Sequence, residues 1–419
     1  MEEIMPDRMP ITIGDHALND FLVFCTSREY QKLLVIADEN TFRVLGRRVA
    51  DAAQGAGLDV ITCVLDPDGL HTDGVSILRV LNAYDAQPRL FVAVGSGTIT
   101  DITRFASHRS QNPFVSFPTA ASVDAYTSKN APVTVGNLKG SIYCQAPLAI
   151  FTDIQTVVES PKFLTASGFG DLVSKATAST DWKISHIVWG VLFDDDIYAN
   201  AVHAGLSVMR VVDGIRTAEP DAMEAMMKGQ FESGFCMADF GNSAPASGAE
   251  HHIAHIWEMM FHWEHKEGLY HGHAVGVAAI ICAEWYSKLK ALSRAEAAAL
   301  LEKTSIPERA VQVHALQSAL PQIAGELIAE NPIYLQLADA EKWAETKNSI
   351  LDNWDAILDV AQNVPDPETL REWIRSLGGP VTPAELGLSA EQVMLAKENG
   401  HYLRDRFSIN ILRKLFGWA

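Results

Sequence analysis

Short apolar segments alternate with helical patterns along the first 158 residues of this 419-residue chain. Residues 33–37 have the sequence Leu-Leu-Val-Ile-Ala, an uninterrupted apolar run that predicts a strand buried on both faces. Residues 41–57 carry apolar side chains at helical spacing, and residues 59–65 predict a second strand. A strand–helix–strand order with continuous apolar strands is typical of a parallel sheet covered by helices on both faces.

The same alternation continues as far as residue 151. The further elements expected are a helix at 75–84, strands at 90–94, 114–117 and 147–151, and a helix directly after the first of these strands. The segments 132–135 and 141–144 flank a glycine-bounded turn and predict a β-hairpin. From about residue 161, helical periods rich in Ala, Met, Leu and Glu replace the strand patterns. We therefore expect a Rossmann-like α/β domain at 1–160 and an all-helical domain at 161–419.

Charge and cysteine content exclude several classes of protein. The chain has 33 Lys and Arg against 52 Asp and Glu, a formal net charge of −19, which disfavours binding to a phosphate backbone. Its five cysteines are scattered and include no Cys-x-x-Cys, so we expect neither a disulfide framework nor a Cys-based zinc site. The N-terminus is acidic and lacks a signal-peptide pattern, and the longest apolar run, 274–285, is too short to cross a bilayer. These features predict a cytoplasmic protein without a membrane span.

A glycine turn follows the expected strand at 90–94 and opens the next helix. It consists of Gly95, Ser96, Gly97 and Thr98, with Asp101 one turn later. Glycines let a backbone approach phosphate oxygens, and a helix N-terminus attracts negative charge. A tight strand–helix turn that needs glycine for its backbone angles explains the same residues. The usual dinucleotide fingerprint would follow the first strand and carry a third glycine, so both interpretations stay open.

Two other polar features follow expected strands, at the edge of the sheet where α/β proteins bind ligands. Asp38 comes directly after the strand at 33–37, where a carboxylate could bond an adenosine ribose or cap the helix that begins near Thr41. Residues 118–128 place hydroxyl groups and one carboxylate after the strand at 114–117. An ordinary polar loop would have the same composition.

Histidines gather in the helical half of the chain. Seven of the 14 fall within residues 251–273, in the segments SGAEHHIAH and HGH, and a GFGD segment precedes them at 168–171. His251 and His255 are four residues apart and therefore share one face of a helix. Any single histidine is more often a satisfied surface or core residue than a ligand. The cluster as a whole favours a divalent metal site completed by a carboxylate from elsewhere.

Five motifs, GSGTITD, PTAASVD, GFGD, SGAEH-x3-H and HGH, occur in this order between about residues 10 and 290. In this order and at these distances they resemble those of the glycerol-1-phosphate dehydrogenases, a family within the group of metal-dependent glycerol dehydrogenases and dehydroquinate synthases. The segments ASVDAYTS and GDLVSKATASTDWKIS are closer to the bacterial branch than to the archaeal one. The resemblance implies a dehydroquinate synthase-like fold, in which the active site lies in a cleft between the two domains.

The resemblance also implies roles for individual residues. Asp171, His251 and His271 would bind one divalent metal, either zinc, nickel or iron, with His255 beside the substrate and Asp124 bonding its hydroxyl groups. Gly95, Ser96, Gly97 and Asp101 would hold the cofactor pyrophosphate, and Thr119, Ser122 and Ser128 would line the nicotinamide half. The candidate catalytic residues are Asp124, Asp171 and His255. The candidate cofactor residues are Asp38, Gly95, Ser96, Gly97, Thr98, Asp101, Thr119, Ala120, Ala121, Ser122 and Ser128.

Three positions depart from the pattern of the wider group. Ser96 replaces the middle residue of a Gly-Gly-Gly turn, Arg104 replaces a lysine, and His273 replaces the glutamate of a His-Gly-Glu motif. His273 could therefore compete as a metal ligand or alter the surroundings of the metal.

The activity implied is an NAD- or NADP-dependent interconversion of dihydroxyacetone phosphate and sn-glycerol 1-phosphate by a homo-oligomer. Asp38 favours NAD, because a carboxylate beside the ribose would repel a 2′-phosphate. Lys129 and Lys139 are candidates for binding the substrate phosphate, although Lys139 is equally explained as a solvated hairpin tip. Two alternatives remain, a related metal-dependent polyol dehydrogenase and a dehydroquinate synthase-like lyase, and the scarcity of Lys and Arg near the motifs counts against the lyase.

Overall fold

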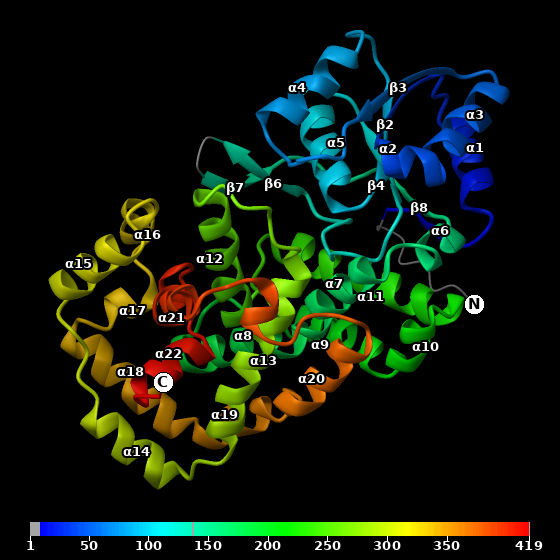
Figure 1. Cartoon of the computed structure of the whole chain (residues 1–419). Coiled ribbons are helices and arrows are strands. Elements are labelled where there is room, and N and C mark those ends of the chain that lie inside the picture. Colours follow the sequence, from blue (N-terminus) through cyan, green and yellow to red (C-terminus); the bar gives the residue numbers. More distant parts are fainter. Residues whose placement is uncertain (1–8, 136–137, 419) are drawn as a thin grey trace. The chain divides into compact units, whose positions relative to one another are not determined.

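The computed structural model describes residues 9–135 and 138–418, and the side chains of residues 135, 138, 139 and 141 are outside this description (Figure 1). The chain forms two compact units. The first contains Met1–Gly168 and Arg210–Ala238, and the second contains Phe169–Met209 and Asp239–Ala419. This division places residues 210–238 with the α/β part of the chain, whereas the boundary expected from the sequence is a single cut at 160/161.

A six-stranded parallel sheet forms the centre of the first unit, as the sequence predicts. Its strands are, in spatial order, β1 (Ile11–Ile13), β8 (Ile150–Thr152), β5 (Phe114–Pro118), β4 (Leu90–Gly95), β2 (Lys32–Asp38) and β3 (Asp59–Leu65). The predicted hairpin is confirmed as β6 (Asn130–Val135) paired with β7 (Leu138–Tyr143), while its turn at 136–137 lies outside the described residues. The strand expected at 147–151 begins three residues later, as β8.

Helices cover both faces of the sheet (Figure 1). Those of the first unit are α1 (Ala17–Ser27), α2 (Glu39–Thr41), a π-helical turn (Phe42–Gly46), α3 (Arg47–Gly55), α4 (Gly74–Ala83), α5 (Gly97–Arg109), α6 (Ile154–Val158) and α10 (Val212–Thr217). The single helix expected at 41–57 is thus divided by the π-helical turn. The N-terminal strand β1 and helix α1 were not among the predicted elements.

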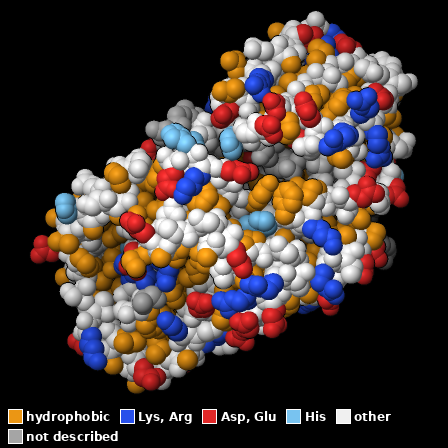
Figure 2. Space-filling model, in the orientation of Figure 1, with side chains coloured by type: hydrophobic (Ala, Val, Ile, Leu, Met, Phe, Trp, Pro, Cys, Tyr) orange, Lys and Arg blue, Asp and Glu red, His pale blue; other side chains and the backbone are white. Residues whose placement is uncertain are grey.

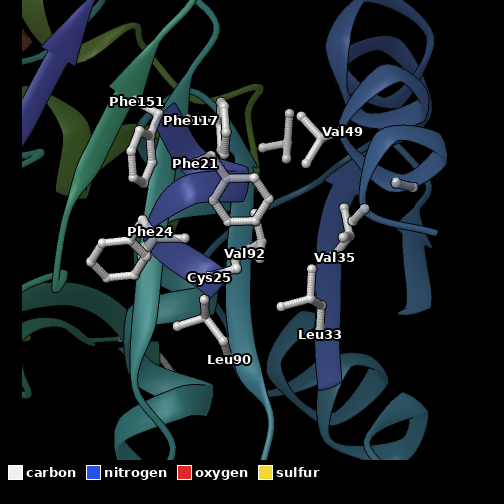
Figure 3. Packing of buried hydrophobic residues seen from close by; sticks show 14 of the residues in the cluster. Phe21, Phe24, Cys25, Leu33, Val35, Val49, Leu90, Val92, Phe117 and Phe151 are labelled. Atoms are coloured by element: carbon white, nitrogen blue, oxygen red, sulfur yellow. The ribbon is translucent and has the colours of Figure 1, made fainter. Parts of the chain in front are cut away.

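The central strands are buried on both faces because their side chains alternate between two cores. Leu33, Val35 and Ala37 of β2 belong to a cluster with α1 and α3, and Leu34 and Ile36 belong to a second cluster with α4 and α5. Figure 3 shows the first cluster, in which aromatic rings of α1 lie against residues of β4, β5 and β8. An uninterrupted apolar sequence is therefore the pattern that this sheet requires.

Described residues beyond Thr152 form helices and connecting segments only, as the sequence predicts. Two helices link the units, α7 (Lys162–Val173) and α11 (Pro220–Phe240). The second unit contains α8 (Lys175–Trp189), α9 (Asp195–Met209), α12 (Ala249–Trp263), α13 (His271–Lys290), α14 (Arg294–Lys303), α15 (Arg309–Ala319), α16 (Ala324–Glu330), α17 (Ile333–Gln336), α18 (Ala340–Asp352), α19 (Trp354–Ala361), α20 (Pro367–Ser376), α21 (Ala390–Asn399), α22 (Ile409–Leu415) and the 3-10 turns Pro383–Leu386 and Gly400–Tyr402.

Acidic and basic side chains are interspersed over the face shown in Figure 2. Among the described residues, no helix combines the length and apolarity needed to cross a membrane.

Phe117 offers a test of the first core. Its ring is fully buried and lies 5.1 Å from that of Phe21 and 5.4 Å from that of Phe151, measured between ring centroids. We expect Phe117→Ala to lower the free energy of unfolding of the first unit by about 3–5 kcal/mol, because it leaves a cavity. Segment-resolved hydrogen exchange in denaturant measures this. Val75→Ala, at a side chain that is 62% exposed, should change the value by less than about 0.5 kcal/mol, and equal effects of the two variants would contradict this account.

Candidate functional site

Three side chains from separate helices of the second unit converge on one point. Asp171 of α7, His251 of α12 and His271 of α13 each direct one potential ligand atom to it, and these atoms all lie within 4.8 Å of one another. The carboxylate and His251 are buried, and His271 is half-buried. A carboxylate oxygen and two imidazole nitrogens are a donor set suited to zinc, iron or nickel. The residues therefore fit a divalent metal.

Glycines allow the helices that carry these residues to approach closely. A Cβ atom on Gly170 would lie 2.4 Å from the carbonyl oxygen of Gly272, and one on Gly276 would lie 3.1 Å from the Cα of Gly170. No side chain fits at the first of these contacts, so α7 and α13 touch through their backbones. Because Asp171 and His271 are the neighbours of Gly170 and Gly272, this contact brings the carboxylate and the imidazole together.

Each candidate imidazole ligand is oriented by a carboxylate. His251 Nδ1 lies 2.8 Å from Glu250 Oε1, and His271 Nδ1 lies 2.6 Å from Glu258 Oε1. With Nδ1 donating to a carboxylate, Nε2 of a neutral imidazole keeps its lone pair for a metal. Neither glutamate was predicted. Glu250 is adjacent to His251 in the sequence, but adjacency alone does not indicate a hydrogen bond between the side chains.

Lys175 supplies the positive charge next to Asp171. Its Nζ lies 3.0 Å from Asp171 Oδ1 and 3.1 Å from the carbonyl oxygen of Ala246, and both side chains are fully buried. Burial by itself would raise the pKa of Asp171, but Lys175 and the imidazoles of His251 and His271 outweigh it and hold that pKa well below its ordinary value. The carboxylate is thus ionised, as a metal ligand must be.

Two further histidines of the motifs have different surroundings. The His255 ring lies 5.9 Å from the His251 ring and 5.5 Å from the His271 ring, measured between centroids. Burial is the main cause that holds the pKa of His255 well below its ordinary value, so this imidazole is neutral. His255 also forms a second close set of potential ligand atoms with Glu258 and His271. His273 belongs to neither set found among the described residues.

The glycine turn of the first unit ends β4 and begins α5. Gly95 is packed so tightly that a Cβ atom there would lie 2.6 Å from Cβ of Ile99. Ser96 is the N-cap residue, but its side chain makes no capping hydrogen bond, and Ser96, Gly97 and Thr98 are half-buried. Such a helix start presents backbone N–H groups to an anion. It therefore fits the phosphate interpretation of these residues.

A buried arginine joins this turn to the following loop. Arg104 forms an ion pair with Asp101, and it donates from Nη2 to the carbonyl oxygens of Ala125 at 2.8 Å and Tyr126 at 3.1 Å. The Arg104 side chain is fully buried. Asp101 therefore has a structural partner within the chain, and its carboxylate helps to hold the guanidinium that positions the loop.

The loop after β5 is not the solvated loop that its composition allows. Thr119, Ala120, Ala121, Ser122, Asp124 and Ser128 are all buried. Ser233 Oγ donates to Asp124 Oδ2 at 2.7 Å, so the carboxylate expected to bond substrate is held by α11. A Cβ atom on Gly168 would lie 1.8 Å from the carbonyl oxygen of Ala121, which explains why the GFGD segment begins with glycine.

Asp38 has the capping role that was one of its two interpretations. Its Oδ1 accepts hydrogen bonds from the backbone N–H groups of Asn40 at 2.8 Å and Thr41 at 2.9 Å. Lys129, the candidate phosphate ligand, is exposed, and the side chain of Lys139 lies outside the described residues.

Comparisons with known proteins extend these observations. Residues 12–161 match the family model described as iron-containing alcohol dehydrogenase. The chain is 30% identical over 402 residues to the glycerol-1-phosphate dehydrogenase (NAD(P)+) of Halalkalibacterium halodurans, covering 95% of this chain and 90% of the relative. It is 29% identical over 403 residues to the protein of that name from Geobacillus thermodenitrificans, with the same coverage.

Solved structures show the same fold. A probable glycerol dehydrogenase from Sinorhizobium meliloti superimposes with a TM-score of 0.63 at 16% identity, covering 97% of this chain and 95% of the other. The glycerol dehydrogenase of Schizosaccharomyces pombe gives a TM-score of 0.55 at 14% identity, covering 100% of this chain and 94% of the other. At these identities the likeness concerns the fold, which is that of the dehydroquinate synthase-like group.

The contact at Gly170 can be tested directly. We expect Gly170→Ala to weaken metal binding by about tenfold or more, because its Cβ would force α7 away from α13 and displace Asp171 from His271. Titration of the metal-free protein with Zn²⁺ measures the affinity. Gly325→Ala is the matched control, since its Cβ would meet no atom within 4 Å. Wild-type affinity in Gly170→Ala would show that the close contact does not position the site.

Proposed function

This chain belongs to the glycerol-1-phosphate dehydrogenase family, and we therefore propose that it interconverts dihydroxyacetone phosphate and sn-glycerol 1-phosphate with NAD(P). The observation that carries the proposal is the convergence of Asp171, His251 and His271, with a carboxylate on Nδ1 of each imidazole. In this proposal the three side chains hold one divalent metal. Zinc, nickel and iron all suit the donor set.

The metal would act as a Lewis acid on the carbonyl oxygen of the ketone, and the nicotinamide would carry the hydride. Around it, Asp171 contributes a negative charge, and Glu250 and Glu258 fix the imidazoles in one tautomer. His255 is neutral and lies beside both imidazoles, where it can donate a hydrogen bond to a substrate oxygen without adding charge. Lys175 offsets the charge of the Asp171 carboxylate.

The first unit would bind the cofactor. The N-terminal turn of α5 offers its backbone N–H groups to the pyrophosphate. Arg104 holds the loop that contains Ser122, Asp124 and Ser128 in a fixed position next to this turn. Ser122 and Ser128 would face the nicotinamide half, and Asp124 would bond a substrate hydroxyl. The placement of this loop and the metal site around one cleft stays a prediction.

A polyol dehydrogenase without a phosphorylated substrate is the second candidate. It is favoured by the chemistry of the convergence point, where Lys175, the lysine that contacts Asp171 among the described residues, is already bonded to Asp171 and the Ala246 carbonyl oxygen. In either case we propose a cytoplasmic enzyme, because all five cysteines are free and buried, as a reducing compartment permits. The homo-oligomer stays a prediction.

A steady-state assay separates the two candidates. We expect the metal-loaded protein to reduce dihydroxyacetone phosphate with a kcat/KM at least about tenfold above that for dihydroxyacetone, since one charged hydrogen bond is worth this much. The product should be sn-glycerol 1-phosphate, identified with a stereospecific enzyme. Equal kcat/KM values for the two ketones would instead support the polyol dehydrogenase.

Metal affinity tests the ligand assignment. His271→Ala should abolish stoichiometric metal binding, and Glu258→Gln should weaken it about 10- to 100-fold, because the imidazole loses the carboxylate that fixes its orientation. Glu302→Gln is the control, since it neutralises a glutamate that is 78% exposed and pairs with Lys347 on the surface. A His271→Ala protein with full metal content would refute the assignment and point to His273.

Cofactor preference tests Asp38. We expect NAD(H) to be used at least as well as NADP(H), and Asp38→Asn to raise kcat/KM for NADPH relative to NADH about tenfold, because like charges no longer repel. Asparagine is as good an N-cap residue as aspartate, so the start of α2 should be preserved. Kinetics with both cofactors measure the ratio. An unchanged ratio would leave Asp38 with its capping role alone.

A further inference from the structure

A pocket of about 440 Å³ in the second unit contains two arginines that no function described above uses. It lies where α8, the start of α12 and the segment after Tyr402 meet, and none of the candidate metal ligands lines it. Its polar lining includes Arg404, Arg406, Ser247, Ser408 and Asp181.

Neither guanidinium has a carboxylate partner within 4.0 Å among the described residues. Arg406 donates to the carbonyl oxygen of Ser247 at 2.5 Å and to Ser243 Oγ at 3.0 Å, so its bonds go to neutral groups. In the part of the chain that the structure describes, Arg404 donates to the carbonyl oxygen of Leu403 alone, at 3.1 Å. Burial and the charge of Arg404 lower the pKa of Arg406 to about 10, so the Arg406 side chain remains cationic at neutral pH.

The acidic residues that line the pocket bond to groups other than the two guanidinium groups or are exposed. Asp181 accepts hydrogen bonds from the backbone N–H groups of Ala249 and Ile409 and from the Tyr286 hydroxyl, at 2.6–2.8 Å. Burial raises the pKa of Asp181 to about 7, so its negative charge is only partial at neutral pH. The Asp405 carboxylate accepts a hydrogen bond from the backbone of Ile333, and Glu330 is exposed. No carboxylate among the described residues therefore forms an ion pair with either guanidinium, although the charges of Glu250 and Asp181 raise the pKa of Arg406.

One hydroxyl group completes the donor set. Ser408 Oγ is buried and has no hydrogen-bond partner among the described residues. Two guanidinium groups and a hydroxyl suit an anion with several acceptor oxygens, and arginine binds phosphate through paired N–H donors. We propose that this pocket binds a phosphate group, held by Arg404 and Arg406. Lys129 and Lys139 of the first unit are then not needed to bind the phosphate.

The phosphate has two possible sources, the substrate or free inorganic phosphate. Ser247 and Gly248 of the pocket directly precede α12, which carries His251. This relation favours the phosphate of the substrate, an assignment that rests on the proposed function. The site itself rests only on the residues of the pocket.

Direct binding tests the site. Inorganic phosphate is titrated by calorimetry into the full-length wild type, Arg404→Gln and Arg294→Gln. We expect saturable binding to the wild type that is weakened about tenfold or more in Arg404→Gln, because a charge-assisted hydrogen bond is lost. Arg294→Gln, which removes a guanidinium that is 59% exposed near Asp352, should bind as the wild type does. No binding to the wild type, or equal affinity in Arg404→Gln, would overturn the proposal.

Kinetics identify the source of the phosphate. If the pocket holds the substrate's own phosphate, Arg404→Gln raises KM for dihydroxyacetone phosphate about tenfold with kcat/KM for dihydroxyacetone unchanged, and inorganic phosphate competes with the phosphorylated ketone. If inorganic phosphate inhibits non-competitively and this inhibition disappears in Arg404→Gln, the result supports the pocket with free phosphate as its occupant. Arg404-dependent phosphate binding by a protein that reduces neither ketone supports the pocket and refutes the proposed function. Normal activity together with phosphate binding that does not depend on Arg404 supports the proposed function and refutes the pocket.

Discussion

The buried carboxylate of Asp171 is the constraint on which the centre of the second unit depends. An ionised group without exposure to water is costly by several kcal/mol unless it is paired and hydrogen-bonded. Lys175 provides the pair from the next helix, and Ala246 in turn accepts from Lys175. The glycine contact between α7 and α13 then places the carboxylate beside His271. A metal would add a second positive charge to a position that is already arranged around an anion.

Hydrogen bonds extend outward from this centre through two further carboxylates. Glu250 accepts from His251, from the backbone N–H of Gly248 and from the Thr177 hydroxyl. One residue along, the backbone N–H of Ala249 donates to Asp181, which also accepts from Tyr286 and Ile409. The C-terminal helix α22 is thus connected to the start of α12. Helix α22 therefore supports α12, the helix that carries His251.

The sequence predicts much of the fold because buried strands and helices have different patterns of apolar residues. Buried strands such as β2 and β4 must be apolar on both faces, and that pattern is visible without a structure. β1 has only three residues, too few to show a period, so the sequence does not predict it. The metal set was implied by resemblance to a family. Glu258 is not predicted as a functional partner, because its contact with His271 joins two different helices and leaves no period in the sequence. Lys175 is not predicted either, although it lies four residues after Asp171, because this spacing alone does not indicate a buried ion pair.

The motif residues also differ in whether their side chains are already bonded to other residues of the chain. Asp38 and Asp101 were both expected to meet the cofactor, yet each has a structural partner, a helix start in one case and Arg104 in the other. Ser96 makes no capping hydrogen bond with its side chain, which keeps the start of α5 available. Residue type and position could suggest these roles, but only the packing shows which groups are already engaged.

The central claim, one divalent metal bound by a carboxylate and two imidazoles, is tested most directly by X-ray absorption spectroscopy of the cobalt-loaded protein. Elemental analysis should give one metal per chain, and the fine structure should show a first shell of oxygen and nitrogen at about 2.0–2.2 Å with outer-shell scattering from two imidazole rings. The outer-shell scattering should fall to that of one ring in His251→Ala. Sulfur in the first shell, or scattering unchanged by loss of His251, would contradict the assignment of the site.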